Sequence, residues 1–183
     1  TTTTINLGAA LADLGFGVLI VDLDPQGNAS TGLGIAAESR SATTYDFLLD
    51  EVSLADVVQP TSHDRLTIIP ATVDLSSADI ELFSNEKRSS LLRNALRQAD
   101  MSDLAPDYIL IDCPPSLNLL TVNAMVAANS ILIPLQGEFF ALEGLSQLML
   151  TIREVRQSVN PQLRIEGVLM TMVDSRNNLS AQV

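Results

Sequence analysis

Residues 18–34 read VLIVDLDPQGNASTGLG, and the class of fold can be predicted from them. It opens on a short run of branched apolar residues, which is typical of a strand buried on both faces of a parallel sheet. The run ends at Asp22 and Asp24, which point to the same side of an extended chain because they are two residues apart. Pro-Gln-Gly-Asn then turns the chain into an amide-rich loop. A buried strand that ends in two carboxylates predicts a ligand site at the edge of the sheet.

Four further segments predict buried strands after Val18–Leu23. They are Leu66–Ile69, Tyr108–Ile111, Ile131–Pro134 and Ile165–Thr171. Segments with helical spacing of apolar residues separate the strands, at residues 5–14, Asp74–Phe83, Arg88–Ala99, Leu117–Ala128 and Ala141–Val159. This alternation predicts an α/β fold, a doubly wound and mostly parallel sheet with helices on both faces.

Composition excludes several functional classes. The 183 residues contain 10 basic and 22 acidic side chains, a net charge of −12 that argues against a broad basic surface for nucleic acid. Cys113 is the only cysteine and His63 the only histidine, so disulfide frameworks and multi-cysteine or His-rich metal sites are excluded within one chain. No apolar run approaches the roughly 18 residues of a membrane span, and we expect no membrane association.

A second strand ends in a carboxylate. Residues 109–115 read ILIDCPP, and Asp112 follows a continuous apolar run. In an α/β protein, an apolar strand that ends in Asp is how a P-loop NTPase holds Mg²⁺ through water. A lone aspartate in this place is more often a solvated loop residue or a helix cap. Two such strand ends in one sheet favour the metal site.

The chain begins with four threonines, Thr1–Thr4, directly before the first helical pattern. Threonine hydroxyls accept hydrogen bonds from the free amides of a first helical turn, so one interpretation is an N-cap run. The other is that a hydroxyl faces Mg²⁺ while the helix N-terminus faces phosphate. A phosphate-binding glycine loop that ends in Gly-Lys would have to precede Thr1, and the 183 residues do not contain it.

Five blocks in fixed order resemble the ParA/Soj chromosome- and plasmid-partitioning ATPases, members of the deviant Walker A group that also contains MinD. The blocks are Thr1–Ala12, Val18–Gly34, Asp107–Leu120, Pro134–Leu148 and Gly167–Val183. In that family a Lys-Gly-Gly-Val-Gly-Lys-Thr-Thr loop leads into the first block. The resemblance therefore implies one P-loop NTPase domain over residues 1–183 that lacks the first strand, the phosphate loop and the C-terminal part.

The resemblance also implies roles for individual residues. Thr1 matches the threonine that ligates Mg²⁺, and Thr2 matches the neighbour that contacts the α-phosphate. Asp24 matches the catalytic aspartate that positions the attacking water. Asp22 matches the acidic residue near the metal, and Asp112 matches the Walker B aspartate.

The last block adds expectations near the C-terminus. The resemblance places Met172 and Asp174 in a strand-end loop beside the nucleotide base. Arg176 is the basic residue that we expect to reach DNA, and a solvated loop arginine is the alternative. We interpret Cys113 as a packed small side chain rather than a reactive thiol.

As the resemblance implies, the intact protein binds ATP and Mg²⁺, forms an ATP-dependent homodimer and then binds DNA non-specifically. A ParB-type centromere-binding partner stimulates hydrolysis, in the cytoplasm and on the nucleoid. Both lysines that the family uses are absent, so we expect these residues alone to hydrolyse ATP hardly at all. Two alternatives stay open. One is a MinD-like membrane-cycling ATPase, which the Asp-Pro-Gln-Gly-Asn loop disfavours, and the other is a non-catalytic interaction domain that starts at Thr1.

Overall fold

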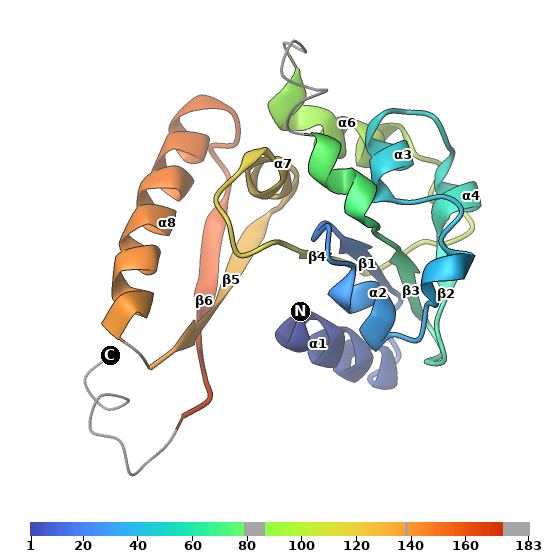
Figure 1. Cartoon of the computed structure of the whole chain (residues 1–183), viewed down its shortest axis with the longest axis horizontal. Helices are drawn as coiled ribbons and strands as arrows, with labels where there is room; N and C mark the ends of the chain where they lie inside the picture. The colour runs from blue at the N-terminus through green and yellow to red at the C-terminus, as the bar shows by residue number, and fades with distance from the viewer. Residues whose placement is uncertain (79–86, 138, 174–183) are drawn as a thin grey trace. The chain divides into compact units, whose positions relative to one another are not determined.

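The computed structural model describes residues 1–78, 87–137 and 139–173 (Figure 1). Contacts within the chain divide it into two compact units, Thr1–Ala124 and Met125–Val183. Each unit is described by itself below. Among the described residues, no helix is both long and apolar enough to cross a membrane.

The first unit is built on a four-stranded sheet with the order β2-β3-β1-β4. Its strands are β1 (Val18–Asp22), β2 (Gln59–Pro60), β3 (Leu66–Ile69) and β4 (Tyr108–Asp112). The central strand β1 pairs in parallel with β3 and β4, and β2 pairs antiparallel with β3. The register places Asp22 opposite Asp112, so the two acidic strand ends lie side by side.

Helices precede, separate and follow these strands in the sequence. They are α1 (Thr2–Asp13), α2 (Asn28–Gly32), η1 (Ala37–Ser39), α3 (Thr44–Leu48), α4 (Leu54–Val57), η2 (Val73–Ser77), η3 (Arg88–Ser90), α6 (Leu91–Gln98) and α7 (Leu119–Ala127). The last of them, α7, crosses the boundary between the two units. The helix α1 packs on β1, β3 and β4, with α2 beside it.

Both faces of the sheet are covered. Val18 and Ile20 of β1 point to one face, where they join a core cluster that includes Ala12 of α1 and Ala29 of α2. Leu19 points to the opposite face because side chains alternate along a strand, and it is also fully buried. A strand buried on both sides explains why its sequence is continuously apolar.

The second unit is a β-α-β arrangement of β5 (Ser130–Gln136), α8 (Phe139–Ser158) and β6 (Arg164–Thr171). β5 and β6 are parallel, and their register shifts by one residue after Ile131. Asn160 lies in the turn between α8 and β6. Its side-chain amide donates to the carbonyl oxygens of Met125 at 2.9 Å and Ala128 at 2.8 Å, which satisfies carbonyls at the end of α7.

The α/β class and the five expected strands are confirmed, and β5 extends one residue before and two residues after the predicted Ile131–Pro134. The predicted helix Asp74–Phe83 begins as the short 3-10 helix η2, and residues 79–83 of it lie outside the described part of the chain. The predicted helix Arg88–Ala99 is a 3-10 turn followed by α6. The organisation as a single domain stays a prediction.

Replacing Asn160 should destabilise the second unit. Asn160→Ala removes the donor to three carbonyls and should cost about 1–3 kcal/mol in the free energy of unfolding. Asn160→Asp should cost more, because a carboxylate would face those carbonyl oxygens without a proton to donate. Urea denaturation measures both, with Gln157→Ala as an exposed control expected within about 0.5 kcal/mol of the parent. Equal stability of Asn160→Asp and the parent would contradict the capping role.

Candidate functional site

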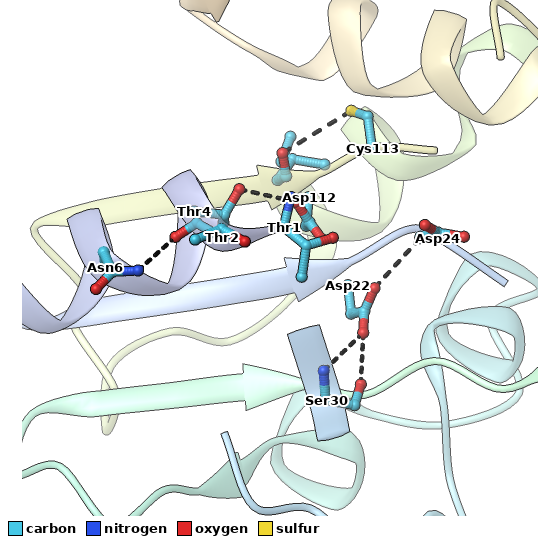
Figure 2. A network of polar contacts seen from close by, with 10 residues as sticks. Thr1, Thr2, Thr4, Asn6, Asp22, Asp24, Ser30, Asp112 and Cys113 are labelled. Carbon is cyan, nitrogen blue, oxygen red and sulfur yellow. Dashed lines mark hydrogen bonds and ion pairs between the residues drawn. The ribbon is translucent and has the colours of Figure 1, made fainter. Parts of the chain in front are cut away.

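The start of α1 meets the end of β4 at Asp112 (Figure 2). Thr1 Oγ1 donates to Asp112 Oδ2 at 2.8 Å, and Thr4 Oγ1 donates to Asp112 Oδ1 at 2.8 Å. Asp112 is buried, so its carboxylate depends on these donors. The structure therefore brings together Thr1 and Asp112, two residues that are 111 positions apart in the sequence.

Thr4 also contacts Asp112, although the sequence predicted no role for it apart from the run of four threonines. It lies three residues after Thr1 and therefore faces the same side of α1. The helical spacing was the signal that could have found it. Thr2, in contrast, is exposed, and its carbonyl accepts from Asn6 Nδ2 at 2.8 Å. Its contact with the α-phosphate stays a prediction.

Asp22 is fully buried at the end of β1 and faces Ser30 of α2 (Figure 2). Its Oδ2 accepts from the Ser30 backbone nitrogen at 2.8 Å and from Ser30 Oγ at 2.6 Å, and its Oδ1 accepts from Asp24 nitrogen at 3.3 Å. Burial raises the pKa of Asp22, the hydrogen bonds from Ser30 and Asp24 partly offset this, and Asp112 adds a smaller repulsion. Both carboxylate oxygens of Asp22 therefore accept hydrogen bonds from the protein itself. The role of Asp22 near the metal stays a prediction.

Asp24 opens the turn that follows β1. Its Oδ1 accepts from Gln26 nitrogen at 3.0 Å, and its carbonyl oxygen accepts from Gly27 nitrogen at 2.8 Å. Asp24 is 6% exposed, and its Oδ2 accepts no hydrogen bond from the described residues. One carboxylate oxygen thus holds the turn while the other stays available to a ligand.

Cys113 follows Asp112 and is half-buried. Its Sγ lies 3.8 Å from the carbonyl oxygen of Ile111 (Figure 2). Burial, together with the adjacent Asp112 carboxylate, raises the pKa of the Cys113 thiol to about 12. The thiol is therefore protonated at neutral pH, in agreement with its interpretation as a packed side chain.

Met172, in the second unit, directly follows β6, has a left-handed backbone with φ +55° and is 82% exposed. Asp174 and Arg176 lie outside the described residues. The predicted base contacts of Met172 and Asp174 and the predicted DNA contact of Arg176 stay predictions.

The donor set fits one kind of metal site. The described part of the chain holds no group of three or more His, Cys, Asp or Glu side chains arranged around a metal. Mg²⁺, however, commonly takes one or two carboxylates and completes its oxygen shell with water and substrate phosphates. The Thr1 hydroxyl beside the Asp112 carboxylate matches that pattern. The residues therefore fit a Mg²⁺ ion shared with a phosphorylated ligand, and not one held by protein groups alone.

Comparison with known proteins identifies the family. The AAA_31 family model, described as an AAA domain, matches residues 1–165. The chain is 56% identical to the chromosome partitioning protein ParA of Caulobacter vibrioides over all 183 residues, which cover 68% of that protein. The chain belongs to the ParA/Soj family of partitioning ATPases. The resemblance read from the five sequence blocks is thereby confirmed.

Other similar proteins agree with this family. The chain is 50% identical to the sporulation initiation inhibitor protein Soj of Bacillus subtilis, again over 183 residues, and covers 71% of that protein. A solved structure of cobyrinic acid a,c-diamide synthase from Mycobacterium smegmatis, with bound ATP analog and magnesium, has a TM-score of 0.90 and 38% identity. That match covers 99% of this chain and 73% of the other. This chain thus has the same fold as a protein whose structure holds an ATP analog and magnesium.

The raised pKa of Cys113 predicts slow alkylation. An ordinary thiol titrates near pH 8.5, so at pH 8 a folded thiol with a pKa of about 12 holds far less of the reactive thiolate. Iodoacetamide should modify the native chain at least about 100-fold more slowly than the chain unfolded in urea at the same pH. Mass spectrometry measures both rates, and the single cysteine makes the assignment unambiguous. Native and unfolded rates within tenfold of each other would contradict the burial argument.

Ser30→Ala should weaken the anchor of Asp22. The change removes a hydroxyl that donates to a buried carboxylate and also accepts from Ala71 nitrogen at 3.1 Å. We expect a loss of about 2–3 kcal/mol in the free energy of unfolding at pH 7. Ser39→Ala, which removes an exposed hydroxyl, is the control and should cost under about 0.5 kcal/mol.

The loss in Ser30→Ala should also depend on pH. Ser30 stabilises the ionised form of Asp22, whose pKa in the folded chain lies above its usual value. Loss of the Ser30 donor raises the folded pKa of Asp22 further in the variant, so the deficit is complete above the variant's folded pKa and shrinks as pH falls towards the folded pKa of the parent. Urea titrations near pH 4 and at pH 7 test this. A deficit that is larger at the lower pH would contradict the assigned partner.

Proposed function

We propose that this chain forms the core of a DNA-partitioning ATPase in which binding of ATP and Mg²⁺ drives dimerisation and non-specific DNA binding. A ParB-type centromere-binding protein stimulates hydrolysis and ends each cycle. One observation carries the nucleotide site: the Thr1 hydroxyl lies 2.8 Å from the buried Asp112 carboxylate at the first turn of α1. Membership of the ParA/Soj family supports the partitioning role.

The chemistry follows from this arrangement. Thr1 and Asp112 would hold Mg²⁺, and the free amides at the start of the twelve-residue helix α1 would face phosphate oxygens. When bound, Mg²⁺ neutralises the charge that develops on the transferred phosphoryl group. The protein's own task is positioning, because phosphoryl transfer requires little covalent chemistry from side chains. The Mycobacterium smegmatis structure, which holds an ATP analog and magnesium on the same fold, supports this assignment.

Asp24 would orient the attacking water. Its Oδ1 is held by Gln26 nitrogen, while its Oδ2 accepts nothing from the described residues and can accept from water. Asp22 would support Asp24 indirectly, since its carboxylate accepts hydrogen bonds from the backbone nitrogens of Asp24 and Ser30. We therefore assign two roles to Asp22: it holds the turn that carries Asp24, and it lies near the metal.

The remaining roles rest on the family. Met172 and Asp174 would line the nucleotide base, and Thr2 would contact the α-phosphate. Arg176 would contact DNA. The protein would act in the cytoplasm, on the nucleoid. The names of its relatives favour this partitioning branch over a MinD-like membrane cycle.

Hydrolysis is testable in a chimaeric chain. The 183 residues contain no phosphate-binding glycine loop, so the chimaera joins them to the parts of the Caulobacter vibrioides relative that lie outside the match. We expect Mg²⁺-dependent ATP hydrolysis. Asp24→Ala should lower kcat at least about 100-fold while nucleotide binding and ATP-dependent dimerisation persist.

Asp24→Asn is the matched variant, because its amide oxygen can still accept from Gln26 nitrogen and keep the turn. It should lose hydrolysis as Asp24→Ala does, which assigns the defect to the carboxylate rather than to the turn. Phosphate release measures turnover, and sedimentation with ATP measures dimerisation. Full turnover in either variant would overturn the role of Asp24, and an inactive parent chimaera would count against the ATPase assignment itself.

A further inference from the structure

The turn that presents Asp24 rests on the side chain of Arg40. Gly27, which closes the turn, has a left-handed backbone with φ +62°. A Cβ atom at this position would lie 2.8 Å from the Ala71 carbonyl oxygen and closer still to Arg40 Nη1. The guanidinium group therefore packs directly against the backbone of the turn. No motif in the sequence analysis singled out Arg40.

Arg40 is held in this place by several acceptors. Its Nη1 donates to the Ala71 carbonyl oxygen at 3.0 Å, and its Nη2 donates to Thr31 Oγ1 at 2.8 Å. Nε and Nη2 also donate to the Ile35 carbonyl oxygen, at 3.2 and 2.7 Å. No carboxylate of the described residues forms an ion pair with it. The guanidinium thus joins α2, the loop after α2 and the segment after β3 through neutral groups.

These contacts continue to the start of the turn. The Ala71 backbone is bound at both of its polar groups, because its nitrogen donates to Ser30 Oγ at 3.1 Å while its carbonyl oxygen accepts from Arg40. Ser30 Oγ in turn donates to Asp22, whose Oδ1 accepts from Asp24 nitrogen. A continuous chain of contacts therefore runs from Asp22 to Arg40 and encloses residues 24–27.

We propose that Arg40 is a positioning residue for Asp24. Arg40 fills the space beside Gly27 and binds the Ala71 carbonyl oxygen. These contacts hold the Asp24 carboxylate in the geometry that hydrolysis needs. A planar group with donors in three directions is required, so lysine is a poor substitute. This inference rests on the proposed catalytic role of Asp24, and its two tests separate the two proposals.

The first test uses the chain of 183 residues itself. Hydrogen exchange by NMR should show the Gln26 and Gly27 amides, which donate to Asp24, exchanging at least about tenfold faster in Arg40→Gln than in the parent. The β1 amides should keep their rates. Arg40→Lys, which retains the charge, should show an intermediate change. Arg97→Gln, in an exposed residue of α6, is the matched control and should show none. Unchanged exchange at Gln26 and Gly27 in Arg40→Gln would overturn the proposal.

The second test uses the chimaeric chain. Arg40→Gln should lower kcat about tenfold or more, since small misplacements of a catalytic group are costly, while KM and the Kd for ADP stay within about twofold. A merely structural role would instead lower the folded fraction and the Tm and leave kcat per bound nucleotide unchanged. That result would overturn the proposal.

The two failures are distinguishable. If the parent chimaera hydrolyses no ATP, the proposed function fails, whereas the exchange rates of Gln26 and Gly27 still decide whether Arg40 holds the turn. If the parent is active and Arg40→Gln retains its kcat, the ATPase assignment stands and the positioning role of Arg40 is overturned.

Discussion

The parallel pairing of β1 with β4 brings two buried carboxylates, Asp22 and Asp112, to neighbouring strand ends. Like charges in a poorly solvated place repel, so each needs its own donors. Asp112 receives the hydroxyls of Thr1 and Thr4, and Asp22 receives the amide and hydroxyl of Ser30. The first turn of α1 and the position of α2 are thus coupled to the charge pattern of the sheet. The polar contacts at these two strand ends follow from this one adjacency.

The sequence predicted the parts of the structure that local patterns determine. Buried strands such as β1 and β3 are short apolar runs between turn signals, and their positions were correct. The acidic strand ends could also be placed together, because parallel strands end at a common edge. The two-residue strand β2 and the short helices α2, α3 and α4 were missed, since elements of two to five residues carry too little periodicity to detect.

The candidate site was predicted less completely than the fold. Local patterns singled out Asp24 and Asp112 as strand-end carboxylates and Thr1 as part of a threonine run, and the family resemblance gave each its role. Ser30 and Arg40, in contrast, have no local sequence signature. Ser30 meets Asp22 only because α2 folds back on β1, and Arg40 reaches Ala71 across 31 positions. Contacts of this kind are created by tertiary packing, which no single-sequence pattern encodes. Asp22 shows the same limit, because its contact with Ser30 depends on the position of α2.

The two backbone hydrogen bonds of Ala71 affect how the network between Asp22 and Arg40 can change in evolution. Both use backbone atoms of Ala71, so the identity of the side chain at this position is irrelevant to them. Substitutions at positions 30 and 40 would be visible in an alignment, while the group that connects them would look unremarkable. Any small residue at position 71 preserves the connection except proline, which has no amide hydrogen to donate. Covariation between positions 30 and 40 would then arise without any direct contact between their side chains.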